Sequence, residues 1–334
     1  MTLSRADRLA GCLIGTAVGD SLLLPGEGMP RRRIERRFPG PLRHRFIFGR
    51  GMISDDTEHH FLVARCLARH RDPQRFGRAL AWRLRWWICC LPAGLGRASL
   101  LACLRLWCGW PWQRAGVASQ GNGPAMRSAI IGVVHGDDAD LCARFVEAAT
   151  VSTHRDPVAL QGALLVAQTA ARICRSALSR PPWEEIQIAD GCAAWRSNLD
   201  LLASWNAAGE DVDGLARRLE CERGVSGWTL HSVTLALGAW WRHRDDASAG
   251  LTAIWRCGGD TDTIGAIAGA LYGIDRGEDA FPAAWVAGIR DWPITVDLLR
   301  ATGRALADSI PLPHWAWPAY PLRNVVFLLI VVLH

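Results

Sequence analysis

Apolar segments with the spacing of α-helices follow one another along most of this chain of 334 residues. In residues 5–24, for example, Leu9, Cys12 and Leu13 are spaced so that they share one face of a helix. Comparable segments recur as far as residue 308, separated by Gly and Pro, and none has the alternation typical of a half-buried strand. We therefore expect an all-α protein.

The expected helices share this spacing and occupy residues 5–24, 54–69, 73–89, 94–107, 125–134, 139–152, 157–178, 183–204, 211–221, 227–243, 263–274, 281–290 and 294–308. A loop rich in Arg, Pro and Gly is expected at residues 28–51. The chain has no internal repeat and no shift of composition that would mark a linker. We predict a single domain over residues 1–334, with a core at 5–308 and a C-terminal extension at 309–334.

Composition limits the classes of protein that this chain can belong to. Half of the residues are hydrophobic and 21% are charged, which is typical of a soluble globular protein and excludes a disordered chain. All 38 basic residues are Arg, a bias that a GC-rich genome explains, so the net charge of +6 predicts no specific nucleic-acid partner. The eleven Cys include no C-x-x-C pair, and we expect reduced thiols, a cytoplasmic protein and no zinc site.

Both ends of the chain carry apolar runs. Residues 9–19 follow Arg5 and Arg8, but Asp7 lies where a signal peptide needs basic residues, so we do not expect one. Residues 325–333 are too few to span a bilayer. We expect a buried terminal strand or helix there, with a tail that touches a membrane as the alternative, and no transmembrane segment.

The sequence from Asp260 to Thr263 brings two carboxylates and two hydroxyls together after a flexible Gly258-Gly259 pair. Asp260 and Asp262 are two residues apart, so both can turn toward one centre on a loop or at a helix N-terminus. Oxygen donors of this kind are the ligands that hard divalent cations prefer. An ordinary helix N-cap with a carboxylate in the first turn is the alternative.

Ser54, Asp55, Asp56 and Thr57 form a second acidic cluster. Adjacent carboxylates repel each other where solvation is poor, so a fold that brings them together usually supplies a cation. If this cluster meets the first one, four carboxylates would suit two divalent ions roughly 3.5–4 Å apart. The alternative is a pair of unrelated helix caps on separate surfaces, and the spacing alone leaves both open.

Three further features carry polar groups. Asp20 ends the first helix, where a carboxylate opposes the helix dipole, which suggests a specific role such as orienting a loop; Glu27 belongs to the same acidic patch. The turn at residues 121–123 could offer backbone N–H groups and an amide to a ribose or a phosphate. Thr153 and His154 either begin a helix or form a hydrogen-bonding pair that faces a pocket.

In this order, the motifs resemble the ADP-ribosylglycohydrolase family, which includes the dinitrogenase reductase-activating glycohydrolases and the ADP-ribosylarginine hydrolases. The similarity extends over about residues 5–308 and is carried by residues 8–20, 25, 27, 54–57, 121–123, 125–127, 153–154, 226–228 and 258–263. The two acidic motifs together are highly specific, and the others support them.

The resemblance implies an orthogonally packed, single-domain helical bundle that binds two divalent cations, Mg²⁺ or alternatively Mn²⁺. The implied metal ligands are Ser54, Asp55, Asp56, Asp260, Asp262 and Thr263. The implied contacts to ADP-ribose are Ser119, Gly121, Asn122 and His154. Glu27 corresponds to a flexible carboxylate of the family that lies beside the metals and the substrate.

The resemblance also implies hydrolysis of the N-glycosidic bond between ADP-ribose and a protein arginine. Asp55 or Asp56 would orient or deprotonate the water, and Glu27 would assist the leaving group or control access to the site. Serine-linked ADP-ribose, free ADP-ribose derivatives and immunity against an ADP-ribosylating toxin are alternatives within this class. A non-catalytic ADP-ribose binder and a structural protein are alternatives outside it. The expected partner of this protein, which we expect to be a monomer, is an ADP-ribosylated protein.

A few positions depart from the family pattern. Leu23 stands where Gly is frequent, which could reshape the loop that carries Glu27, and Arg155 begins an unusual continuation of the Thr-His pair. Ser54 replaces the more frequent Thr but retains a hydroxyl, so coordination is not threatened. The Trp-rich segment 82–112 is expected to pack in the core and in a lid, and a role in binding adenine stays open.

Overall fold

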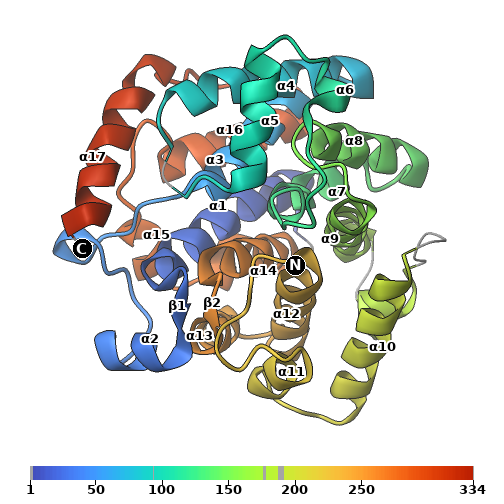
Figure 1. Cartoon of the computed structure of the whole chain (residues 1–334), viewed down its shortest axis with the longest axis vertical. Helices are drawn as coiled ribbons and strands as arrows, with labels where there is room; N and C mark the ends of the chain where they lie inside the picture. The colour runs from blue at the N-terminus through green and yellow to red at the C-terminus, as the bar shows by residue number, and fades with distance from the viewer. Residues whose placement is uncertain (1–2, 93, 176–177, 187–191, 334) are drawn as a thin grey trace.

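The computed structural model describes residues 3–92, 94–175, 178–186 and 192–333 (Figure 1). Within these ranges the chain forms 17 α-helices and one ribbon of two short strands, which confirms the all-α prediction. The helices are α1 (Arg5–Leu23), α2 (Arg31–Arg37), α3 (Asp55–Leu67), α4 (Pro73–Cys89), α5 (Arg97–Trp107), α6 (Trp112–Ala115), α7 (Ala129–His135), α8 (Ala139–Val151), α9 (Pro157–Arg175), α10 (Ala193–Ala207), α11 (Val212–Arg218), α12 (Thr229–Arg242), α13 (Ala247–Cys257), α14 (Thr261–Arg276), α15 (Ala283–Gly288), α16 (Val296–Asp308) and α17 (Tyr320–Leu333).

Helices α1 and α14 lie against each other at the centre of the molecule, and the other helices surround them (Figure 1). Glycines allow the two backbones to touch. A Cβ atom on Gly11, Gly15 or Gly19 would lie 2.2, 2.1 or 1.9 Å from a carbonyl oxygen of α14. The two helices run antiparallel. This contact therefore places the end of α1, which carries Asp20, beside the start of α14, where Asp260 and Asp262 lie.

The two-stranded ribbon pairs β1 (Met29–Pro30) with β2 (Gly258–Gly259) in antiparallel register. Both glycines of β2 have positive φ angles, 72° and 86°. A Cβ atom on Gly259 would also lie 2.0 Å from the carbonyl oxygen of Val225. The glycine pair that we expected to be flexible is therefore a tightly packed strand that only glycine can form.

Most of the expected helices are confirmed, and the expected helix at 73–89 coincides with α4. The sequence does not predict α2, which lies in the expected loop at 28–51, or α13. Helix α2 buries only Ile34, so it lacks an apolar face, and an ion pair of 3.0 Å between Arg31 and Glu35 supports it instead.

Two expected helices differ in their first halves. The helix expected at 125–134 opens with a 3₁₀ turn at Ala125–Arg127 before α7 begins. The helix expected at 183–204 is wrong at its start, because Pro182–Glu184 form a 3₁₀ turn and α10 begins at Ala193. Residues 187–191 lie outside the described residues.

The C-terminal run forms a helix, α17, but the expectation that it is buried is wrong. Leu322 is 63% exposed and Leu329 is 58% exposed, and α17 lies at the periphery of the molecule (Figure 1). The side chains that point inward include Arg323, Asn324 and Phe327. The apolar composition of the run did not reveal that Arg323 and Asn324 point into the protein while Leu322 and Leu329 point outward.

Among the residues that the structure describes, two helical stretches are long and apolar enough to cross a membrane, judged by length and composition: Arg5–Gly26 and α9. The first is completely buried inside the protein and the second is largely buried, as core helices are. All eleven Cys are free thiols, and most of them are buried. The expected single domain over residues 1–334 stays a prediction.

Candidate active site

The two acidic motifs meet in one cleft. Thr263, in the first turn of α14, donates a hydrogen bond of 3.3 Å from its Oγ1 to Oδ2 of Asp56, in the first turn of α3. The cleft between these helix starts has a volume of about 640 Å³. The alternative of two unrelated caps on separate surfaces is thereby excluded.

Helix capping accounts for the position of Ser54 but not for that of Asp260. Ser54 caps α3, because its Oγ accepts a hydrogen bond of 3.3 Å from the backbone N–H of Asp56. Asp260 precedes α14 without any capping bond from its side chain. Its Oδ2 instead accepts a hydrogen bond of 2.5 Å from Nδ2 of Asn122. The carboxylate of Asp260 therefore faces the cleft rather than the helix backbone.

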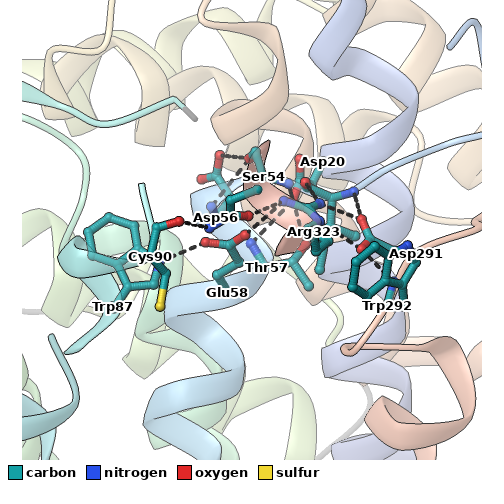
Figure 2. A network of polar contacts seen from close by, with 12 residues as sticks. Asp20, Ser54, Asp56, Thr57, Glu58, Trp87, Cys90, Asp291, Trp292 and Arg323 are labelled. Atoms are coloured by element: carbon teal, nitrogen blue, oxygen red, sulfur yellow. Dashed lines mark hydrogen bonds and ion pairs between the residues drawn. The ribbon is translucent and has the colours of Figure 1, made fainter. Parts of the chain in front are cut away.

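Asp20 holds the turn that carries the first acidic motif (Figure 2). Its Oδ2 accepts hydrogen bonds from the backbone N–H of Ser54 at 2.8 Å, from the N–H of Thr57 at 3.2 Å and from Oγ1 of Thr57 at 2.5 Å. The carboxylate thus reaches from α1 to the positive end of α3. This contact is the loop-orienting role that its position in the sequence suggested.

The other expected site residues line the same cleft: Glu27, Asp55, Ser119, Gly121, Asn122, His154 and Asp262. Ser54 and Asp56 are buried beneath its wall. The ribbon fixes the loop of Glu27, since the N–H of Gly28 donates to the carbonyl oxygen of Gly259 at 2.8 Å. The structure therefore brings every residue expected at the site into one place.

Thr153 and His154 form a hydrogen-bonding pair that faces the cleft, as one of the two interpretations of the sequence predicted. Nδ1 of His154 lies 2.9 Å from Oγ1 of Thr153, which also accepts a hydrogen bond from the buried Arg127. Burial, and then the charge of Arg127, lower the pKa of His154 to about 3. Its imidazole is therefore neutral at physiological pH.

The carboxylates of the cleft have raised pKa values. Burial, followed by neighbouring carboxylates, raises the pKa of Asp55, Asp56 and Asp262 well above the usual range. Burial also raises the pKa of Asp20 to about 6. Glu27 is exposed at the mouth of the cleft, yet the protein atoms crowded around it, and then nearby aspartates, raise its pKa to about 7.

The donor chemistry of the cleft fits a hard divalent cation. Oδ1 of Asp56 and Oδ1 of Asp262 are buried without a hydrogen-bond partner. The hydroxyls of Ser54 and Thr263 both donate to the other oxygen of Asp56, Oδ2. Oxygen donors without a thiolate or an imidazole suit Mg²⁺ or Mn²⁺ rather than zinc. As they stand, the described residues include no group of three or more His, Cys, Asp or Glu side chains that could hold a metal ion.

Without a cation, the protein is expected to lose stability as the pH rises. Asp20 has a pKa of about 6 in the folded state against 3.8 normally, so between these values the folded protein retains a proton that the unfolded chain has lost. The unfolding free energy therefore falls as the pH rises through this window. Melting curves in chelator should show this fall, and added Mn²⁺ should raise the melting temperature more at the upper end of the window. A response to Mn²⁺ that is independent of pH would contradict the expectation.

Sequence reasoning missed a buried ionic network directly behind the first acidic motif (Figure 2). Nε of Arg323 donates to Oδ1 of Asp291 at 2.9 Å, and its Nη1 donates to Oε1 of Glu58 at 3.2 Å. Its Nη2 donates to the carbonyl oxygen of Ile53 at 2.6 Å, while the N–H of Ile53 donates to Oδ2 of Asp291 at 2.9 Å. Only the polar pair Arg323-Asn324, directly before the apolar run at 325–333, could have signalled it.

A larger cavity, of about 950 Å³, lies on another side of α3 and is lined by Glu58 together with Trp82, Trp86 and Trp87. Its walls contain a single carboxylate, so it lacks the acidic chemistry of the cleft. In the described part of the chain, no Trp of segment 82–112 lines the acidic cleft. These tryptophans therefore give no support to a role in binding adenine there.

Comparison with known proteins agrees with the fold. A solved structure described as an ADP-ribosylglycohydrolase-related protein complex superimposes with a TM-score of 0.67 at 26% identity, covering 91% of this chain and 98% of the other. The helical architecture and the acidic cleft thus define a glycohydrolase fold. The family model for ADP-ribosylglycohydrolase matches residues 1–315, so this chain belongs to the ADP-ribosylglycohydrolase family.

Similar chains occur in distant organisms. An uncharacterized protein of Archaeoglobus fulgidus is 29% identical over 297 residues, which cover 85% of this chain and 92% of the relative. The uncharacterized protein YegU of Escherichia coli K12 is 27% identical over 308 residues, with coverage of 84% and 91%. The family acts on ADP-ribosylated substrates and generally depends on a pair of metal ions.

Proposed function

We propose that this protein is a cation-dependent hydrolase that removes ADP-ribose from modified protein side chains, with arginine-linked ADP-ribose as its substrate. The observation that carries the proposal is the hydrogen bond between Thr263 and Asp56, which joins the two acidic motifs in one cleft. The expected cytoplasmic location and monomeric state belong to the proposal.

Oxygen-bearing side chains from both motifs would hold the cations: Ser54, Asp55, Asp56, Asp260, Asp262 and Thr263. When bound, two Mg²⁺ ions, or alternatively Mn²⁺, supply Lewis acidity toward the ribose hydroxyls and toward a water molecule. The unpartnered oxygens of Asp56 and Asp262 support this assignment, because a buried carboxylate oxygen without a partner is costly.

Other residues that line the cleft would bind ADP-ribose. Ser119 and Gly121 lie there with Asn122, whose amide is held by Asp260. His154, being neutral, can donate or accept a hydrogen bond without repelling or attracting the diphosphate strongly. These groups orient the substrate so that its ribose lies toward the carboxylates.

The reaction breaks the bond between C1 of the ribose and the guanidinium nitrogen, and the oxygen of water replaces it. Positive charge develops on the ribose as the bond breaks, and the surrounding carboxylates stabilise that charge. Asp55 or Asp56 orients the water and accepts its proton. Glu27, with a pKa of about 7, carries a proton near neutral pH that it can pass to the departing nitrogen.

Release of ADP-ribose from matched substrates tests the proposal. The full chain is incubated with Mg²⁺ and either an arginine-modified or a serine-modified peptide, and ADP-ribose is followed by chromatography, with a chelator control. We expect release from the arginine-linked peptide only, and none with chelator. Release from the serine-linked peptide alone would retain the hydrolase and change the linkage, whereas tight binding without release would favour a non-catalytic binder.

A further inference from the structure

Helix α17 presents an uncharged apolar face to the outside of the protein. Its outward side chains are between 37% and 63% exposed: Leu322, Val325, Val326, Leu328, Leu329 and Val331. An exposed apolar surface of this extent normally marks a site of interaction. The helix follows the part of the chain that the family model matches, which ends at residue 315.

The apolar face is a fixed feature and not a loose tail, because the inward side of α17 is bonded to the protein core. Arg323 donates to the carbonyl oxygen of Ile53 and to two buried carboxylates, as described above. Nδ2 of Asn324 donates to the carbonyl oxygen of Cys90 at 2.8 Å. Since these polar groups hold the helix in one orientation, the six apolar side chains named above stay turned outward.

A second apolar group lies next to α17. Phe48 is 96% exposed and has a φ angle of 56°, a strained value for a residue other than glycine. The turn that presents it is closed by a hydrogen bond of 3.0 Å from the N–H of Phe46 to the carbonyl oxygen of Arg50. The ring of Phe46 packs edge-on against Phe327 of α17, with centroids 5.9 Å apart. Figure 1 shows the end of α17 beside this part of the chain.

The two segments that carry this face and the Phe48 turn contain basic but no acidic residues. Arg43 and Arg50 are exposed on either side of the Phe48 turn. Residues 36–53 and 309–334 contain no Asp or Glu. An uncharged helix face, an exposed aromatic ring at the tip of a turn and flanking arginines are the features with which proteins bind the interface of an anionic membrane.

We propose that α17 and the Phe48 turn dock this protein on a lipid surface that carries anionic headgroups. The 14 residues of α17 are too few to span a bilayer, so the helix lies in the interface with its outer face in the acyl region. Phe48 inserts beside it, and Arg43 and Arg50 contact the headgroups. This inference goes beyond the proposed hydrolase and does not depend on it.

Vesicle flotation with the full chain tests the docking surface. The probes are vesicles of phosphatidylcholine alone and of phosphatidylcholine with phosphatidylglycerol. We expect the protein to float with the anionic vesicles and to bind the neutral ones on the order of tenfold more weakly. Failure to float with either kind of vesicle would overturn the proposal.

Matched variants locate the contact. Phe48→Ser and Leu328→Ser should each reduce flotation on the order of tenfold, because each removes an inserted apolar group. Leu104→Ser, on α5, is the control, since Leu104 and Leu328 are both 50% exposed and neither substitution opens the core. Equal flotation of all three variants would overturn the assignment. So would light scattering that shows a dimer lost in Leu328→Ser, because α17 would then bind a second copy.

Discussion

Asp260→Ala is expected to lower kcat/KM for ADP-ribose release by about 10²–10³-fold while the fold is retained. The carboxylate of Asp260 makes no capping bond to α14 and faces the cleft, where we propose that it binds a cation. Its removal also relieves repulsion among crowded carboxylates, so the melting temperature without cations should change little. Steady-state kinetics at saturating Mg²⁺ and melting curves in chelator measure the two effects.

Asp246→Ala is the matched control, because Asp246 is a genuine cap. Its Oδ1 accepts a hydrogen bond of 3.0 Å from the N–H of Ala249 at the start of α13. This variant should lose about 1 kcal/mol of stability and retain its activity. If Asp260→Ala behaves in the same way, with lower stability and full turnover, then Asp260 is an ordinary helix-start residue and our assignment of it is wrong.

Arg323→Met is expected to lower the free energy of unfolding by about 3–5 kcal/mol. Arg323 is 1% exposed and its guanidinium pairs with Asp291 and Glu58, which are also buried. The apolar replacement would leave two buried carboxylates without their cation, and the carbonyl oxygen of Ile53 without its donor. Urea unfolding of the purified protein measures the loss.

The control for this substitution is Arg300→Met. Arg300 also pairs with a carboxylate through two hydrogen bonds, of 2.9 and 2.7 Å to Glu278, but its side chain is 26% exposed. Solvent screens this pair, so the loss should be about 1 kcal/mol or less. If the two variants lose equal free energy of unfolding, burial does not make the Arg323 network more stabilising than an exposed ion pair.

The site could be predicted from the sequence because its signals are local. Asp56 and Asp262 each lie in a first helical turn, beside hydroxyls and after a break, and such short patterns remain recognisable without a structure. The convergence of the two motifs could not be derived from the residues alone. It depends on the close packing of α1 against α14. The spacing of the glycines in α1 permits this packing, but the spacing alone does not predict which helix packs there.

The parts that the sequence did not predict depend on distant partners. Arg323 is separated by 270 residues from Ile53, whose carbonyl oxygen it binds, and no local pattern links them. Helix α2 lacks an apolar face, so its seven residues resemble a charged loop. The outward orientation of the apolar side chains of α17 follows from the two buried polar residues Arg323 and Asn324, which lie directly before the apolar run. The composition of the run itself does not reveal that orientation.

The central claim is that both acidic motifs bind the same cations, and anomalous diffraction from crystals grown with Mn²⁺ and ADP-ribose tests it most directly. We predict two manganese peaks roughly 3.5–4 Å apart in the cleft, with ligands from both Asp56 and Asp262. The distal ribose of ADP-ribose should lie against them. Absence of manganese from the cleft, or ions bound by one motif without the other, would contradict the account.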